Sequence, residues 1–241
     1  MKGHMKTQVI LAAAGDGVRL KTDTPKPFVR LQDKPMLLYS LEVFDRTAMI
    51  DSVLILTRAD WLERCRDLIQ KNGIQKVIDV LPGGKTRCES VRKGLDAVDA
   101  DTKYVLIHDA ARPLITQRLV EESLRVCYDE QAVILGVPVK PTIKKVRAKD
   151  NTVEATLDRG QLWEVQTPQV FRKDIILAAH AGADDLCATD DAFLVERCGH
   201  KVKVVRGDYS NIKITSPEDL LLAELLLPTQ RSSGTTGTGK R

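Results

Sequence analysis

Short apolar segments alternate with amphipathic segments along this 241-residue chain, and this alternation limits the possible fold more than any other feature. The expected strands are short apolar runs bounded by turn residues, at 9–13, 52–57, 77–81, 104–107, 132–137 and 202–205. One helix is expected to begin at Pro35, and others to cover residues 60–71, 86–98, 117–128, 173–181, 190–198 and 216–227. Strands and helices that alternate in this way form a parallel sheet with helices on both faces. The sequence therefore predicts the α/β class with a mainly parallel sheet.

Residues 140–164 interrupt this alternation. They carry β-branched and charged residues without a helical stripe, and Lys149, Asp150 and Asn151 suit a turn. We expect a β-hairpin arm over residues 139–165, which would bury too little surface to be stable alone and so would pack against a partner. Residues 6–228 are expected to form a single domain that includes this arm. The Gly-, Ser- and Thr-rich residues 229–241 are expected to form a disordered tail.

Composition and charge exclude several classes of protein. Hydrophobic residues make up 43% of the chain and charged residues 29%, which is typical of a globular protein. The net charge of +4 depends on basic residues near the two ends, so no nucleic-acid-binding surface is indicated. Apolar runs stay well short of the roughly 20 residues that cross a bilayer. The five scattered cysteines indicate neither a disulfide framework nor a zinc site. We therefore expect a cytoplasmic protein that binds neither nucleic acid nor membranes.

The loop after the first strand suits phosphate binding. Its small residues, with one aspartate among them, are Ala13, Ala14, Gly15, Asp16 and Gly17. Small side chains let backbone N–H groups approach a ligand closely, and such a turn can hold phosphate oxygens. Arg19 and Lys26 on the same loop favour a polyphosphate site over an ordinary turn. A dinucleotide-binding fingerprint is excluded, because Leu20 stands at its third glycine position.

A second glycine loop, Gly83-Gly84-Lys85-Thr86, lies between an expected strand and an expected helix. Its last three residues resemble the end of a Walker A motif, but Asp79 stands where that motif needs glycine. We therefore expect the loop to contact a base or a ribose rather than to wrap phosphates. Ser90, in the first turn of the following helix, could hydrogen-bond there.

Further polar residues lie at or after the end of the strand 104–107. Ligands bind at the carboxyl ends of strands in open α/β sheets. Asp109 and Arg112, in the segment 108–113, could form a structural ion pair or contact such a ligand. The remaining polar candidates are spread over the second half of the chain: Thr142, Asp158, Arg159, Thr167, Gln169, Thr189, Asp190, Asp191, Asn211 and Lys213.

Taken in order, these motifs resemble those of the 2-C-methyl-D-erythritol 4-phosphate cytidylyltransferase family, from about Gln8 to Leu227. The resemblance is carried by Ala13-Ala14-Gly15-x-Gly17-x-Arg19, Pro25-Lys26, Gly83-Gly84-x-x-Arg87, Ser90-Val91, residues 108–113, Thr167-Pro168-Gln169, Thr189-Asp190 and Asn211-Ile212-Lys213. It implies a Rossmann-like nucleotidyltransferase fold and the transfer of CMP from CTP to methylerythritol phosphate, with release of pyrophosphate, in non-mevalonate isoprenoid synthesis. It also implies Mg²⁺, held mainly by the CTP phosphates, and a homodimer joined through the arm.

The resemblance also implies roles for individual residues. Arg19 and Lys26 would bind the triphosphate and stabilise the departing pyrophosphate, and Lys213 would contact the α-phosphate. The residues that would bind the nucleotide are Ala13, Ala14, Gly15, Asp16, Gly17, Gly84, Lys85, Ser90, Asp109 and Ala110. The residues that would bind the acceptor are Asp109, Arg112, Thr167 and Thr189, together with Thr142 and Arg159 from the partner's arm. No residue is assigned as a direct metal ligand.

Two residues depart from the family pattern. Pro27 follows Lys26 where the family usually has glutamine, and proline biases the residue before it toward extended backbone. Lys85 stands where relatives often carry an acidic residue near cytosine, and lysine cannot accept a hydrogen bond from the cytosine amino group. A backbone carbonyl would have to accept it.

Two alternatives stay open at this point. A ribitol 5-phosphate cytidylyltransferase shares most of these motifs and would differ in the acceptor pocket. A non-catalytic nucleotide-binding module is the alternative from another class. The presence of Arg19, Lys26 and Lys213 argues against it, because binding alone would not need all three cations.

Overall fold

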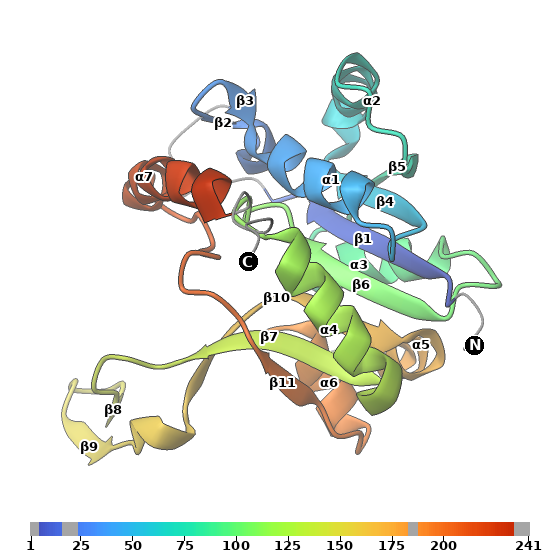
Figure 1. The fold of residues 1–241 in the computed structure, drawn as a ribbon. Helices are drawn as coiled ribbons and strands as arrows, with labels where there is room; N and C mark the ends of the chain where they lie inside the picture. The colour runs from blue at the N-terminus through green and yellow to red at the C-terminus, as the bar shows by residue number, and fades with distance from the viewer. Residues whose placement is uncertain (1–4, 16–23, 183–187, 234–241) are drawn as a thin grey trace, which may run out of the picture.

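A seven-stranded sheet forms the centre of the computed structural model, in which residues 5–15, 24–182 and 188–233 are described (Figure 1). Its strands, in the order in which they lie side by side, are β11 (Lys203–Arg206), β7 (Ala132–Pro138), β10 (Trp163–Arg172), β6 (Tyr104–Asp109), β1 (Thr7–Ala13), β4 (Ser52–Thr57) and β5 (Val77–Pro82). All neighbouring strands are parallel except β10, which is antiparallel to both β6 and β7. The predicted α/β class and mainly parallel sheet are confirmed.

The strand β10 is missing from the strands that the sequence pattern predicts. Its centre is buried but polar, since Gln166, Thr167 and Gln169 are at most 5% exposed. Gln166 donates to the Asp208 carbonyl (2.8 Å) and Gln169 to the Asp190 carboxylate (2.8 Å). Because these partners lie far away in the sequence, no local apolar pattern reveals the strand.

Helices cover both faces of the sheet. On one face lie α1 (Met36–Arg46), α2 (Leu62–Lys71) and α4 (Gln117–Glu130), and on the other lie α3 (Arg87–Asp96), α5 (Lys173–Ala181) and α6 (Asp191–Arg197). Successive strand residues point to opposite faces, so Leu11 of β1 packs with the first group and Ile10 with the second. Gly94 lets α3 lie close to the sheet, because a Cβ there would come within 2.9 Å of both Ile10 and Leu56.

A smaller apolar cluster joins the last helix to the segment before α1. In it, Ala223 and Leu227 of α7 (Pro217–Ser233) pack with Leu31 and Met36. The short elements of this part of the chain are η2 (Lys26–Phe28), β2 (Arg30–Leu31) and β3 (Lys34–Pro35), and η3 (Ala59–Trp61) precedes α2. The predicted tail of residues 229–241 is wrong as far as Ser233, because α7 continues to that residue. Residues 234–241 lie outside the described part of the chain.

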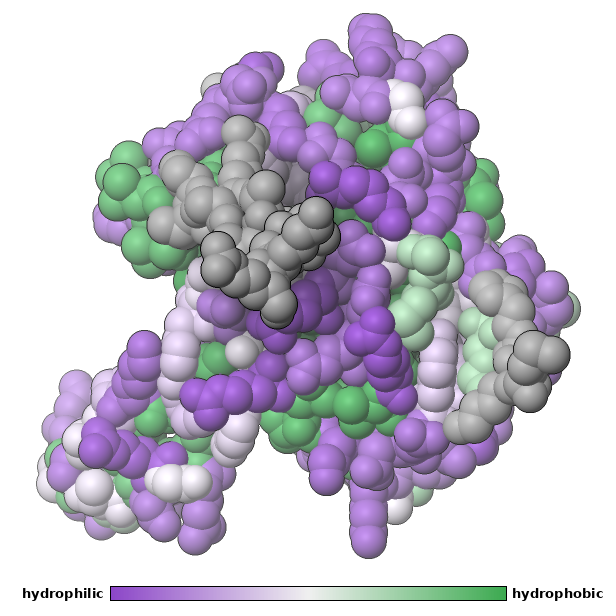
Figure 2. Space-filling view, in the orientation of Figure 1, coloured by the Kyte–Doolittle hydropathy of each residue, from purple (hydrophilic) through white to green (hydrophobic). Residues whose placement is uncertain are grey.

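Between β7 and β10 the chain leaves the sheet and forms the arm (residues 139–162). Within it, β8 (Lys144–Val146) and β9 (Val153–Thr156) pair antiparallel as a separate two-stranded sheet, followed by η4 (Arg159–Gln161). Asn151 has a φ of 57°, in the left-handed region that suits the predicted turn. Figures 1 and 2 show the arm standing away from the body of the molecule. The predicted hairpin is confirmed, and its packing against a partner stays a prediction.

Within the described ranges, no helix combines the length and the apolar character that crossing a membrane requires.

Candidate active site

A cavity of about 610 Å³ opens at the carboxyl edge of the sheet. Its walls come from residues at or just past the ends of β1, β4, β5 and β6, whose carboxyl ends meet there because the strands are parallel. The chain passes from β1 to β4 on one side and later returns to β6 on the other side. Ligands bind at such a switch point in open α/β sheets. The cavity is therefore where the sequence predicts a ligand.

Most of the predicted nucleotide residues that the structure describes line this cavity. Together with the two described catalytic candidates, they are Ala14, Gly15, Gly84, Lys85, Ser90, Asp109, Lys26 and Lys213. Ala13 and Ala110 do not line it, because both are buried, at no more than 1% exposure. Asp16, Gly17 and Arg19 lie outside the described residues.

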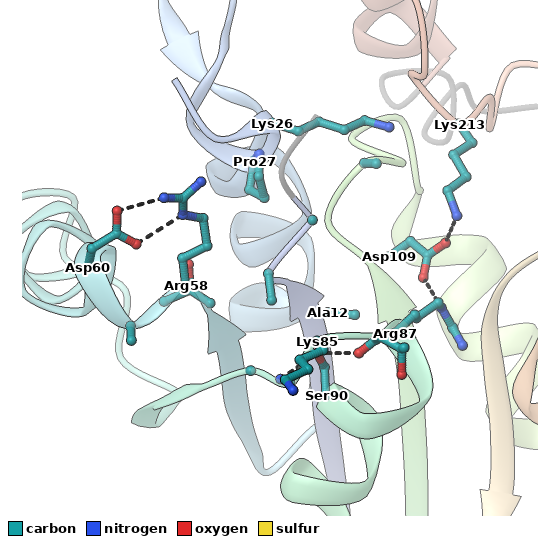
Figure 3. A pocket seen from close by; sticks show the side chains of 18 of the residues that line it. Ala12, Lys26, Pro27, Arg58, Asp60, Lys85, Arg87, Ser90, Asp109 and Lys213 are labelled. Carbon is teal, nitrogen blue, oxygen red and sulfur yellow. Dashed lines mark hydrogen bonds and ion pairs between the residues drawn. The ribbon is translucent and has the colours of Figure 1, made fainter. Parts of the chain in front are cut away.

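Six charged or polar residues with no predicted role also line the cavity: Thr57, Arg58, Asp60, Thr86, Arg87 and Thr215. Arg58 and Asp60 form an ion pair (2.8 Å) with each other (Figure 3). Arg58 directly follows β4, so the rule that ligands bind at the carboxyl ends of strands would have found it.

The two glycine loops lie against each other at Gly83. A Cβ at that position would lie 2.4 Å from the Cβ of Ala14, so only glycine permits this contact. The Ser90 hydroxyl accepts the Gly84 N–H (2.9 Å) and donates to the Thr86 carbonyl (2.8 Å). The Ser90 proton is therefore used inside the loop, and contact of Ser90 with a base or a ribose stays a prediction. Ser90 fixes the shape of the loop.

Lys26 begins the 3-10 helix η2, which differs from the extended backbone expected before a proline. Pro27 is buried in the first turn of this helix, where the missing N–H removes no helical hydrogen bond. Figure 3 shows the Lys26 and Lys213 side chains extending from separate segments, and both line the cavity. Pro27 therefore does not turn Lys26 away from the cavity.

Asp109 holds two cations at the boundary of the cavity. Its Oδ1 accepts from Nε of Arg87 (2.8 Å), and its Oδ2 accepts from Nζ of Lys213 (2.5 Å). Burial alone would raise the pKa of the Asp109 carboxyl, but the charges of Arg87 and Lys213 outweigh burial and hold this pKa well below its usual range. Arg87 and Lys213 thus take the place of Arg112, which the sequence offered as the structural ion-pair partner of Asp109. Asp109 is ionised and fixes the direction of both cations.

A second cavity, of about 240 Å³, adjoins the first. The two share Arg87, Asp109 and Lys213. The predicted acceptor residues Arg112, Thr167 and Thr189 also line the second cavity. A ligand in one cavity would therefore meet a ligand in the other at the Asp109 group.

Thr167, His108 and Arg112 form a directed chain of hydrogen bonds behind Asp109. The Thr167 hydroxyl accepts the backbone N–H of Asp109 (3.1 Å) and lies 3.0 Å from Nδ1 of His108. Nε2 of His108 lies 3.1 Å from the Arg112 carbonyl, which can only accept, so the proton sits on Nε2 and Nδ1 accepts from Thr167. Burial lowers the pKa of His108 to about 4, so the ring is neutral at pH 7.

Two residues that are expected to bind the acceptor already have partners within the protein, and their roles in acceptor binding stay predictions. The Thr167 hydroxyl proton is donated to His108, so it is not available to an acceptor. The Arg112 guanidinium donates from Nη1 to the Asn211 carbonyl (2.7 Å) and from Nη2 to the Val165 carbonyl (3.1 Å). Both residues therefore shape the wall of the smaller cavity in this structure.

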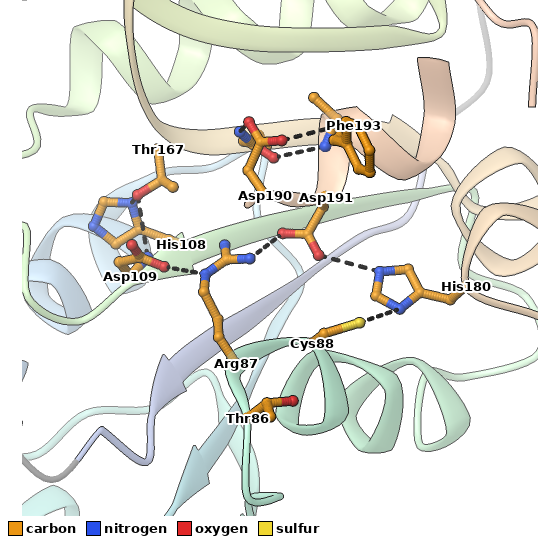
Figure 4. Close-up of polar contacts among 12 residues, drawn as sticks. Thr86, Arg87, Cys88, His108, Asp109, Thr167, His180, Asp190, Asp191 and Phe193 are labelled. Carbon is orange, nitrogen blue, oxygen red and sulfur yellow. Dashed lines mark hydrogen bonds and ion pairs between the residues drawn. The ribbon is translucent and has the colours of Figure 1, made fainter. Parts of the chain in front are cut away.

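Arg87 is also joined to a buried pair that the sequence motifs do not explain. Its Nη1 donates to Oδ2 of Asp191 (2.7 Å), whose Oδ1 accepts from Nε2 of His180 (3.1 Å) (Figure 4). Asp191 and His180 are each 2% exposed or less. Burial opposes the charge of Asp191, but Arg87 outweighs burial and lowers the pKa of Asp191. The result is a continuous polar chain from α5 to Lys213.

Thr142 and Arg159 lie on the arm and line neither of these two cavities. Both side chains are exposed, and Nη1 of Arg159 donates to the Lys140 carbonyl (2.8 Å). Within one chain, the structure does not bring them to the other candidate residues.

The described residues do not form a site for Mg²⁺ by themselves. Among them, no group of three or more His, Cys, Asp or Glu side chains could hold a metal ion. Asp109, the buried carboxylate nearest both cavities, already has a cation on each oxygen. We derive no step of the chemistry through a metal ion.

Comparisons with known proteins find relatives that match most of the chain. The model of the family 2-C-methyl-D-erythritol 4-phosphate cytidylyltransferase matches residues 7–229. A protein of that name from Alkaliphilus metalliredigens is 44% identical over 232 residues, which are 95% of each chain. Another, from Caldanaerobacter subterraneus, is 42% identical over 226 residues, covering 92% of this chain and 99% of the relative.

Two solved structures share the fold. A 4-diphosphocytidyl-2C-methyl-D-erythritol synthase from Anaerococcus prevotii matches with a TM-score of 0.83 and 31% identity, over 93% of this chain and 97% of its own. A 2-C-methyl-D-erythritol 4-phosphate cytidylyltransferase from Thermus thermophilus matches with a TM-score of 0.75 and 30% identity, over 93% and 100%.

Proposed function

Because this chain belongs to the 2-C-methyl-D-erythritol 4-phosphate cytidylyltransferase family, we propose that its larger cavity binds CTP and its smaller cavity binds the acceptor. The chain is an enzyme that transfers CMP from CTP to 2-C-methyl-D-erythritol 4-phosphate, releasing pyrophosphate, in the non-mevalonate synthesis of isoprenoid precursors. One observation supports the division of the cavities most directly: they meet at Arg87, Asp109 and Lys213.

The reaction brings two anions together. A phosphate oxygen of the acceptor attacks the α-phosphorus of CTP, a new P–O bond forms, and the bond to pyrophosphate breaks. The protein therefore has to neutralise charge and align the attack. No general base is needed, because the attacking phosphate oxygen is already ionised.

Three cations have the positions or sequence motifs for this work. Lys213 lies at the boundary of the two cavities, which suits contact with the α-phosphate during transfer. Lys26 lines the larger cavity, which suits contact with the β- and γ-phosphates, and we assign Arg19 to the same task from its motif. A charge directed in advance at the developing transition state lowers the barrier most.

The glycine loops are our proposed site for cytosine and ribose. Ala14, Gly15 and Gly84 present backbone groups to the larger cavity, and the Lys85 side chain can only donate. A backbone carbonyl would then accept from the cytosine amino group. UTP presents a carbonyl at that position and would leave two acceptors facing each other, so we expect CTP to be strongly preferred. Equal kcat/KM for UTP and CTP would contradict this assignment.

We propose that Mg²⁺ enters with CTP, bound mainly by the triphosphate oxygens. Mg²⁺ in phosphate-transfer sites is commonly held by one or two carboxylates and the substrate phosphates rather than by an all-protein cage. Removal of free Mg²⁺ with a chelator should abolish transfer, and added Mg²⁺ should restore it.

We further propose a homodimer in which the arm of one subunit completes the acceptor site of the other. The arm and the nearby start of β10 expose large apolar side chains: Val146, Val153, Leu157, Trp163 and Val165. Such side chains are expected at an interface. Thr142 and Arg159 are then available to bind the acceptor phosphate of the partner.

A cytoplasmic location is part of the same proposal. The four cysteines that the structure describes, Cys65, Cys88, Cys127 and Cys198, are free thiols, which suits a reducing compartment.

A pyrophosphate-release assay tests the assignment of the acceptor. We expect release with CTP and 2-C-methyl-D-erythritol 4-phosphate, and little release when ribitol 5-phosphate replaces that acceptor. Faster release with ribitol 5-phosphate would contradict the assignment.

A further inference from the structure

Many of the hydrogen-bond donors that line the smaller cavity already have an acceptor within the protein. Gln166 donates to the Asp208 carbonyl and Gln169 to Asp190, each at 2.8 Å. The Thr167 hydroxyl donates to His108, and Lys213 donates to Asp109. Among the charged side chains that line this cavity, Arg87, Arg112 and Lys213 each keep N–H groups that their contacts within the protein do not use.

Arg87 differs from the other two in having a whole terminal nitrogen that no described residue accepts from. Its Nε and Nη1 are held by Asp109 and Asp191, while no described residue accepts from its Nη2. Figure 4 shows that third nitrogen directed toward the space between Thr167 and Asp190, two residues that line the smaller cavity. A guanidinium held on two sides presents its remaining N–H groups in a fixed direction.

The position of Arg87 matches the place where the attack must occur. Arg87 lines both cavities, as Lys213 does, so an oxygen near its Nη2 lies where the two cavities adjoin. The acceptor group that attacks the α-phosphorus is its phosphate. The group most suited to contact Arg87 is therefore this attacking phosphate, because guanidinium groups bind phosphate oxygens well.

From this geometry we propose that Arg87 binds the phosphate of the acceptor from within its own chain, and that Asp191 and His180 are positioning residues that aim it. The proposal rests on the assignment of the smaller cavity to the acceptor. Asp191 acts through Arg87, since one of its oxygens accepts from Arg87 and the other accepts from His180.

The variant Arg87→Lys tests this proposal, because removing the whole side chain would leave two buried carboxylates without a partner and could unfold the protein. Lysine keeps the charge but cannot contact both aspartates and the acceptor. We expect the KM for 2-C-methyl-D-erythritol 4-phosphate to rise by about 10- to 100-fold, as expected for loss of a hydrogen bond between charged groups, with the KM for CTP near the wild-type value. A matched control is Arg172→Lys, whose guanidinium also holds an aspartate with two donors, but at the opposite edge of the sheet.

Asp191→Asn tests the positioning role. We expect Asp191→Asn to raise the KM for the acceptor less than Arg87→Lys does. In a chain that already carries Arg87→Lys, it should raise this KM little further, because the effects of residues that act through each other are not additive. Additive effects of the two substitutions would overturn the role of Asp191.

Three outcomes for Arg87→Lys would overturn the proposal for Arg87 itself. They are an unchanged acceptor KM, a rise confined to the KM for CTP, and a lowered melting temperature with both KM values unchanged. The wild-type enzyme measured in the same assay separates these failures from failure of the cavity assignment. If the wild type transfers CMP to ribitol 5-phosphate rather than to this acceptor, the assignment of the acceptor is wrong rather than the role of Arg87.

Discussion

At the scale of single residues, we expect the positive charge of Lys26 to determine kcat. It lines the larger cavity from a short helix, and Pro27 anchors that helix in the protein. Lys26→Ala should lower kcat at least about 100-fold while the fold persists, because it removes a preorganised charge from the transition state. Steady-state kinetics with saturating CTP measure this effect. Lys71→Ala, an exposed lysine at the end of α2, is the control, and a near-normal kcat for Lys26→Ala would show that Lys26 is not catalytic.

We expect the burial of His108 to make the free energy of unfolding depend on pH. Its pKa is about 4 in the folded protein, against 6.5 for the ordinary group, so the unfolded chain binds more protons between these values. Stability should therefore fall as pH falls from about 6.5 to 4, by up to about 3 kcal/mol from this residue. His108→Gln, whose amide can donate to Arg112 and accept from Thr167, should flatten this dependence. Urea unfolding at pH 7, 6 and 5 measures it.

The control for that experiment is His200→Gln, since His200 is exposed. It should keep the wild-type dependence on pH. Asp109 and Asp191 have lowered pKa values, so their contributions are present above the ordinary pKa of a carboxyl, about 3.8, and are lost below it. They therefore do not affect the interval from pH 7 to 5. An unchanged slope in His108→Gln would mean that His108 does not titrate in this way.

At the scale of elements, the contact between the two glycine loops determines the shape of the larger cavity. Gly83→Ala would place a Cβ 2.4 Å from the Cβ of Ala14 and 3.0 Å from the Ser90 hydroxyl. One loop has to move, so we expect a higher KM for CTP and a lower melting temperature. A core-like overpacking of this kind typically costs about 1–3 kcal/mol.

Gly182→Ala is the matched control for Gly83→Ala. A Cβ there would meet nothing within 4 Å, and the backbone has a φ of −92°, which alanine adopts without strain. This variant should be neutral or slightly stabilising. If Gly83→Ala leaves the KM for CTP and the melting temperature as little changed as Gly182→Ala does, the close contact of the loops is not needed for CTP binding or for stability.

The elements also show how much the sequence can predict. Strands β1, β4, β5, β6 and β7 have local apolar signals, and each appears close to its expected place. β10 has none, because its buried glutamines and Thr167 are satisfied by partners distant in sequence. Lys26, Asp109 and Lys213 were predictable from motifs, whereas Arg58 and Asp60 were not. The partners of the Ser90 and Thr167 hydroxyl groups within the protein were not predictable, because a sequence does not show which group accepts a proton.

At the scale of the whole molecule, one chain contains both cavities, but its arm extends away from them. Arg159 and Thr142 are exposed on this arm and line neither cavity. If they bind the acceptor phosphate, they do so on a second subunit, in a twofold dimer where each arm serves the other site. Arg159→Ala should then raise the KM for the acceptor and leave the KM for CTP nearly unchanged.

Mixed dimers test this sharing of sites directly. A chain with Arg159→Ala keeps Lys26, and a chain with Lys26→Ala keeps Arg159. In a mixed dimer, the cavities of the first chain therefore receive an intact arm from the second, and one of the two sites is complete. Random exchange at equal concentrations makes half of the dimers mixed, so activity should return to about one quarter of the wild-type value in a twofold dimer. The control pairs Lys26→Ala with a chain carrying both substitutions, which can form no complete site. If exchange is demonstrated and activity stays at the level of the parents, Arg159 serves its own chain, and the arm joins subunits without completing their sites.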